Sequence, residues 1–130
     1  MREIKFRAKT INTGNWVESI TIAKGTIKRK RDDYFFELDE NRWVGVDAKT
    51  IGQFTGLMDK NGKEIYEGDF CIVPYLGDEK TRGVIEYKNG AFVFMSKENP
   101  SLQVVGWSMI KPSETEVVGN IFETPELPNF

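Results

Sequence analysis

The fold class is decided by residues 50–66, which read TIGQFTGLMDKNGKEIY. Two runs rich in apolar and β-branched residues flank Asn61-Gly62, a dipeptide that tolerates the positive φ angles of a tight hairpin turn. A second such dipeptide, Asn89-Gly90, stands between the apolar runs 83–87 and 91–95. The pattern predicts two antiparallel hairpins.

Further short strands are expected on both sides of these hairpins. Residues 4–9, IKFRAK, alternate apolar and basic, as in a strand with one solvated face. Similar runs occur at 16–22, 34–38, 42–46, 70–73, 102–107 and 116–122, whereas 74–82 is expected as a loop. No window carries a helical stripe over three turns, so we expect at most one or two short helices.

The chain is therefore predicted to be mainly β, with many short antiparallel strands forming small barrel-like subdomains. We place an N-terminal β subdomain at residues 1–66 and a C-terminal one, with an SH3-like pattern, at residues 67–130. One compact domain is the alternative, because 130 residues fit either arrangement.

The composition offers few of the residue types that enzymes use for catalysis. The chain has no histidine and a single cysteine, Cys71, so Ser-His-Asp and Cys-His pairs and zinc sites built on Cys and His are excluded. Cys71 lies between Phe70 and Ile72, which predicts a buried thiol. Since no glycine-rich phosphate loop is present either, we expect no enzyme, no cofactor and no metal site.

Two motifs that contain carboxylates could be functional sites or simple turns. Glu67 and Asp69 bracket Gly68 and could act as a catalytic pair, but a turn entering a strand explains them equally well. Residues 59–62, DKNG, are similar to the start of a calcium loop, yet Phe70 stands where its twelfth residue should be Glu. The hairpin interpretation is favoured.

The compartment is expected to be the cytoplasm. The first residues, MREIK, lack the apolar run of a signal peptide, and no stretch approaches the roughly 20 apolar residues of a membrane helix. With only one cysteine, an intramolecular disulfide cannot form. We therefore expect no contact with a membrane.

Charge is unevenly distributed along the chain, although the net charge is only −2. Residues 1–31 carry nine Lys or Arg against two acids, whereas residues 66–130 carry five against ten. Such a basic region could bind nucleic acid or a partner protein, with stacking by Trp16, Tyr34 or Phe35. The candidate residues are Lys5, Arg7, Lys9, Lys24, Lys28, Arg29, Lys30 and Arg31.

Two blander interpretations of the basic region remain open. It could be a solvated loop beside Asp32 and Asp33, with the aromatic residues in the core. Alternatively, residues 28–31 could meet acids from residues 114–126, within the chain or across an oligomer interface. We favour this pairing of residues 28–31 with acidic residues, because the C-terminal half of the chain carries an excess of acidic side chains.

Residues 4–8, 51–69, 83–87 and 117–123 resemble corresponding blocks of the YopX family of phage-encoded proteins, in the same order. The resemblance implies a phage or prophage origin and a mainly β fold. It implies no catalytic or binding residues, and residues 10–50 lie outside the matching blocks.

Taken with the composition, this resemblance indicates a phage or prophage accessory protein that acts by binding. The first hypothesis is a protein-interaction or self-assembling module, for which we expect a homo-oligomer or an unidentified host or phage protein as partner. A nucleic-acid-binding regulator that uses the basic N-terminal region is the alternative, and it is not favoured because the isoelectric point is about 5.3.

Overall fold

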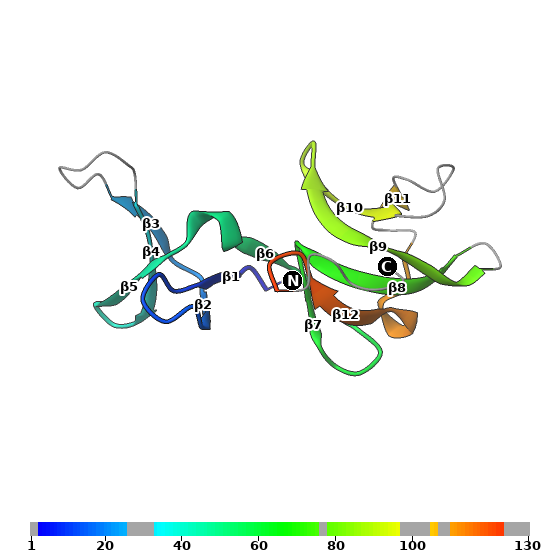
Figure 1. Ribbon diagram of the computed structural model, residues 1–130, viewed down its shortest axis with the longest axis horizontal. Helices are drawn as coiled ribbons and strands as arrows, with labels where there is room; N and C mark the ends of the chain where they lie inside the picture. The colour runs from blue at the N-terminus through cyan, green and yellow to red at the C-terminus, as the bar shows by residue number, and fades with distance from the viewer. Residues whose placement is uncertain (1–2, 26–32, 76–77, 97–104, 107–109, 124–130) are drawn as a thin grey trace. The chain divides into compact units, whose positions relative to one another are not determined.

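The computed structural model describes residues 3–25, 33–75, 78–96, 105–106 and 110–123 (Figure 1). Within these ranges the only helices are two single turns of 3-10 helix, η1 (Ala48–Thr50) and η4 (Pro112–Glu114). The predicted mainly β fold is therefore confirmed. The strands are β1 (Phe6–Lys9), β2 (Trp16–Ser19), β3 (Ile22–Gly25), β4 (Asp33–Asp39), β5 (Arg42–Val46), β6 (Gly52–Met58), β7 (Glu64–Tyr66), β8 (Asp69–Tyr75), β9 (Asp78–Lys88), β10 (Ala91–Ser96), β11 (Val105–Gly106) and β12 (Glu116–Asn120).

The chain divides into an N-terminal unit, residues 1–54, and a C-terminal unit, residues 55–130. The sequence prediction placed its boundary at residues 66–67. Strand β6 runs through the observed division, and β7 follows it. Ile65 of β7 is fully buried in a cluster with Cys71 and Ile85, so apolar burial assigns β7 to the C-terminal unit.

The N-terminal unit contains two sets of antiparallel strands that are joined by backbone hydrogen bonds. β1 pairs with β2 and β6, and β4 pairs with β3 and β5. The end of β1 reaches β5, because Ile11 N donates to Gly45 O at 3.0 Å and Asp47 N donates to Lys9 O at 2.8 Å. These links connect the two sets of strands.

The core of the N-terminal unit follows from strand alternation. Ala8 of β1, Phe36 of β4 and Val46 of β5 are almost completely buried, and they point to a common interior. Partly buried apolar side chains pack around them: Phe6, Val17, Ile22, Tyr34, Leu38, Val44 and Ile51.

A bend at Ile20 divides the single strand predicted at residues 16–22. The hydroxyl oxygen of Ser19 lies 2.6 Å from Glu37 O and 3.0 Å from Thr21 O, and its single proton is shared between these two acceptors. Residues before the bend pair with β1, while residues after it, as far as Gly25, pair with β4. One segment thereby serves both sets of strands.

The C-terminal unit is built on a five-stranded antiparallel sheet in the order β11-β10-β9-β8-β12 (Figure 1). Its buried cluster is Ile65, Cys71, Val73, Ile85, Phe92, Phe94, Ile110 and Val117. The loop expected at residues 74–82 is wrong, because β8 continues to Tyr75 and β9 begins at Asp78. Thr81 pairs with Val73, since backbone pairing extends the hairpin through polar residues.

Both Asn-Gly dipeptides lie at the predicted hairpin turns. Asn61-Gly62 connects β6 to β7, and Gly62 has a φ of +79°. Asn89-Gly90 connects β9 to β10, with φ angles of 53° and 82°. Positive φ at both residues is typical of the type I′ turn, which matches the twist of the flanking strands.

Asp59 fastens the first hairpin to the last strand of the C-terminal unit. Its carboxylate accepts hydrogen bonds from Asn61 N at 2.8 Å, Lys63 N at 2.9 Å and Val117 N at 3.0 Å. Burial raises the pKa of Asp59, but these backbone donors and the charge of Lys63 outweigh it and hold the pKa below its ordinary value. Residues 58 positions apart in sequence are thereby joined by one side chain.

Candidate functional site

Cys71 and Asp69, two of the residues weighed as catalytic candidates, are buried. Cys71 is fully buried, as predicted. Asp69 is 1% exposed and accepts a hydrogen bond from Tyr66 N at 2.8 Å, so its carboxylate supports the turn at Gly68, whose φ is +92°. Among the described residues, no group of three or more Asp, Glu or Cys side chains could hold a metal ion.

Three predicted basic residues lie together on the outward side of β1. Lys5, Arg7 and Lys9 alternate with Phe6 and Ala8, which point into the core. We call Lys5, Arg7 and Lys9 the basic face of β1. The period-two pattern of the sequence was sufficient to predict this grouping.

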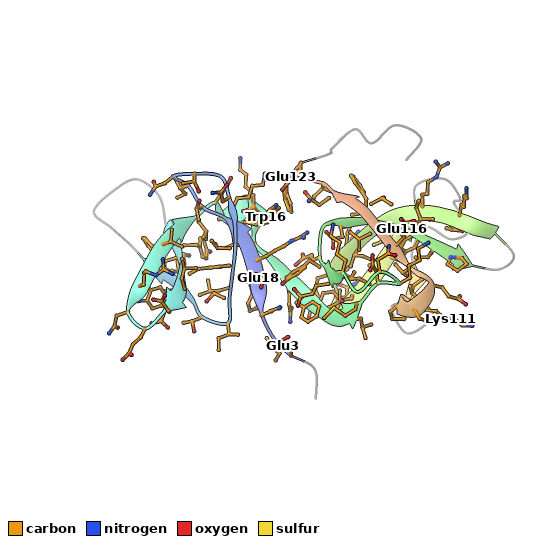
Figure 2. All side chains as sticks on the ribbon, turned by 90° about the horizontal axis from the view of Figure 1, so that it is seen from below. Glu3, Trp16, Glu18, Lys111, Glu116 and Glu123 are labelled. Atoms are coloured by element: carbon orange, nitrogen blue, oxygen red, sulfur yellow. The ribbon has the colours of Figure 1, made fainter. Side chains whose placement is uncertain are left out.

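Neighbouring side chains engage the basic face of β1. The ring of Trp16 on β2 lies 4.7 Å from Arg7 Cζ and 5.4 Å from Lys9 Nζ, measured to its centroid. Lys5 Nζ lies 3.6 Å from Glu18 and 3.9 Å from Glu3, and these acidic residues are labelled with Trp16 in Figure 2.

Burial weakens the basic face as an anion site. The side chain of Lys5 is only 15% exposed, and its ammonium lies 5.1 Å from the centroid of the Phe54 ring. A phosphate group would compete with Glu18 for this cation and with the ring of Trp16 for Arg7 and Lys9.

The other predicted site residues do not join this face. Lys24 belongs to β3, where its ammonium lies 6.0 Å from the centroid of the Tyr34 ring. Residues 28–31, with Lys28, Arg29, Lys30 and Arg31, lie outside the described residues. Of the nine basic residues counted in residues 1–31, four lie in the described part of the chain, with the two acids Glu3 and Glu18; the other five are Arg2 and residues 28–31.

A second surface emerges from the register of β3, β4 and β5. Phe36 is paired with Ile22 and Val44 on the core side, whereas Phe35 is paired with Ala23 and Gly45 on the opposite side. Directly paired residues share a face of a sheet, and alternate residues along a strand return to it. Trp43 and Gly25 therefore also belong to the side of Phe35.

This surface is apolar at its centre. The ring of Phe35 lies over two glycines, since a Cβ at Gly25 would be 3.0 Å from its Cε2 and a Cβ at Gly45 would be 3.8 Å from its Cε1. Ile11 adjoins the ring, because its Cδ1 would be 3.6 Å from the same Cβ at Gly45. We call Ile11, Ala23, Gly25, Phe35, Trp43 and Gly45 the outer apolar face.

Two large apolar side chains of the outer apolar face are exposed. Ile11 is 52% exposed and Trp43 is 43% exposed. Isolated exposed apolar residues are common, but a group of them on one sheet face is typical of an interaction surface. The chemistry that this arrangement offers is burial of apolar area against another molecule.

Charged groups at the edge of the outer apolar face are largely engaged. Glu37, paired with Trp43, accepts a hydrogen bond from Asn41 N at 3.1 Å, and Asp47 accepts one from Lys49 N at 3.1 Å. At the β4–β5 turn, Arg42 Nη2 lies 2.9 Å from Asp39 Oδ2. This hydrogen bond and the charge of Asp39 raise the pKa of Arg42.

Sequence reasoning grouped Tyr34 and Phe35 as stacking residues and did not predict the outer apolar face. The signal was present in the run Tyr34-Phe35-Phe36, because three consecutive apolar residues in a strand cannot all face one core. Which of them faces outward depended on register, which a sequence does not contain.

Comparison with known proteins gives a family and a fold. A family profile described as YopX protein matches residues 5–128. The crystal structure of protein EF1440 from Enterococcus faecalis is similar, with a TM-score of 0.54 and 23% sequence identity over 98% of this chain and 99% of that chain. No curated protein matches. In the part of the chain that the structure describes, no helix is long and apolar enough to cross a membrane.

Proposed function

Since the chain belongs to the YopX family, we propose that it is a phage or prophage accessory protein that acts by binding another polypeptide. Its place of action is the cytoplasm of a bacterial host. The outer apolar face is the binding surface, and no chemical step is involved.

The observation that carries this proposal is the exposure of Ile11 and Trp43 beside Phe35. Protein interfaces are enriched in aromatic side chains and depleted of charge at their centres. Tryptophan in particular contributes large affinities when a partner removes it from water. The outer apolar face has these properties, with the partly buried Phe35 at its centre and the exposed Ile11 and Trp43 beside it.

Site-specific photo-crosslinking in bacterial cells tests the proposal. Benzoylphenylalanine replaces Trp43 in the outer apolar face, and in a matched control it replaces Lys88, an exposed residue of the C-terminal unit. We expect irradiation to produce polypeptide adducts at position 43 and far fewer at position 88. Equal yields at the two positions would contradict the proposal.

The second candidate, a nucleic-acid-binding regulator, is supported by Lys5, Arg7 and Lys9 lying on one face beside Trp16. It is weaker because Lys5 is mostly buried and paired with acids. Retention of the protein on single-stranded DNA tests this candidate, since affinity for phosphates falls steeply with salt. Strong, salt-sensitive retention that is lost in the double variant Arg7→Ser, Lys9→Ser would favour it over the first.

A further inference from the structure

We infer that the occupant of the outer apolar face is a second copy of this chain, packed face to face about a two-fold axis. The inference rests on the proposed function and deepens it by naming the partner. In such a dimer each copy contributes the same patch, so that Trp43 and Ile11 of each copy are removed from water.

Shape supports this occupant. Phe35 lies low over Gly25 and Gly45, while Ile11 and Trp43, at the positions flanking Gly45, keep about half of their surface exposed. Raised side chains beside a low centre allow the two faces to interdigitate, as the inner faces of packed sheets do. A single copy leaves these side chains exposed to water.

The charges at the edge of the outer apolar face also favour a second copy of this chain over a partner with a strong net charge. Lys9 on β1 borders one side of the outer apolar face, because Asp47 N donates to Lys9 O and Ile11 lies two residues beyond Lys9. Glu37 on β4 borders another side, opposite Trp43. A two-fold axis that crosses the face between Lys9 and Glu37 brings the lysine of each copy toward the glutamate of the other.

The basic face of β1 does not suit a second copy. Its three cations, Lys5, Arg7 and Lys9, would meet cations of the same kind if it were the centre of a two-fold interface. None of the six residues of the outer apolar face is charged. At its edge, Arg42 is paired with Asp39, and Lys9 and Glu37 have opposite signs.

Sedimentation equilibrium over a range of concentrations tests the inference with the full chain. We expect wild type to form a dimer, with twice the chain mass of 14.9 kDa. Trp43→Lys should raise the dissociation constant by about a hundredfold or more, because each dimer loses this residue twice. The matched control is Ile20→Lys, which changes an isoleucine that is 75% exposed and lies outside the face; it should leave the constant unchanged.

Two results would overturn the inference. One is a wild-type protein that stays monomeric at the highest concentration, and the other is an oligomer that Trp43→Lys leaves intact. Circular dichroism and thermal unfolding of each variant exclude misfolding as the cause of a lost dimer, and Ile11→Lys provides a second substitution in the face.

Crosslinking at position 43 separates this inference from the proposed function. Adducts with the mass of two chains support both. Adducts with a different polypeptide, together with a monomeric pure protein, overturn the second copy while supporting the proposed function. Absence of any polypeptide adduct at position 43 contradicts both.

Discussion

Replacing Asp59 with alanine should destabilise the C-terminal unit strongly. Asp59 is 5% exposed, and its two oxygens accept three backbone hydrogen bonds. Alanine leaves the donors without this acceptor, and Val117 is the buried residue of β12, so water does not readily replace the carboxylate at its N–H.

The magnitude follows from those three donors. Asn61 and Lys63 lie in an exposed turn, so water recovers most of their lost hydrogen bonding. Val117 is 8% exposed, and an unsatisfied buried amide costs about 1–3 kcal/mol. Adding the lost charge-assisted bonds of the turn, we expect Asp59→Ala to lower the free energy of unfolding by about 3 kcal/mol.

The pH dependence has a definite sign. Because the pKa of Asp59 is lowered in the folded chain, its contribution is present in full above the pKa of the unfolded chain, about 3.9. That contribution is lost as the pH falls below this value toward the pKa of the folded chain. The difference in unfolding free energy between wild type and Asp59→Ala should therefore shrink below about pH 4.

Urea denaturation followed by circular dichroism measures the effect, and hydrogen exchange of the Val117 amide locates it. The control is Asp47→Ala, which removes an exposed carboxylate that accepts a hydrogen bond from Lys49 N, and it should cost about 1 kcal/mol or less. If the free energy of unfolding of Asp59→Ala lies within about 0.5 kcal/mol of the wild-type value at neutral pH, the carboxylate does not stabilise the unit as its geometry indicates.

Three further substitutions test separate parts of the structure. Gly83→Ala should lower the free energy of unfolding in urea by about 2 kcal/mol or more, because the new Cβ would meet the carbonyl of Met95 and lie 2.7 Å from Phe94 Cζ. The control is Gly106→Ala, whose Cβ meets nothing within 4 Å. Equal stability of the two variants would refute the packing argument. Gly62→Val should cost about 1 kcal/mol or more, since a β-branched residue is strained at a φ of +79°; an unchanged melting temperature would contradict this expectation. Replacing Lys28, Arg29, Lys30 and Arg31 with serine should leave DNA binding weak, as we expect it to be in wild type; loss of tight, salt-sensitive binding with an unchanged solution mass would favour the regulator.

Local signals account for the parts of the fold that were predicted correctly. Asn61-Gly62 and Asn89-Gly90 specify hairpin turns through their own φ preferences, and alternation in residues 4–9 identifies a strand, observed at Phe6–Lys9, and the side of it that faces away from the core. The burial of Cys71 follows from its apolar neighbours. Each of these inferences needs only a few adjacent residues.

Long-range pairing accounts for the parts that were not predicted. Residues 74–82 look like a loop because they are polar, yet Val73 pairs with Thr81 and the ladder continues past them. The bend after Ser19 depends on a hydrogen bond to Glu37, eighteen residues away. A local sequence pattern does not identify a partner that lies far away along the chain.

By itself, therefore, the sequence determined a mainly β chain, its hairpin turns and the outward alternation of Lys5, Arg7 and Lys9, because these depend on backbone preferences and on the period of a strand. Only the tertiary structure decided that Phe35 faces outward with Trp43 and Ile11, since one step of register would have exchanged Phe35 with Phe36. It likewise decided that Asp59 reaches Val117. The physical reason is that surfaces and buried hydrogen bonds are made between segments distant in sequence, and their identity is set when those segments pair.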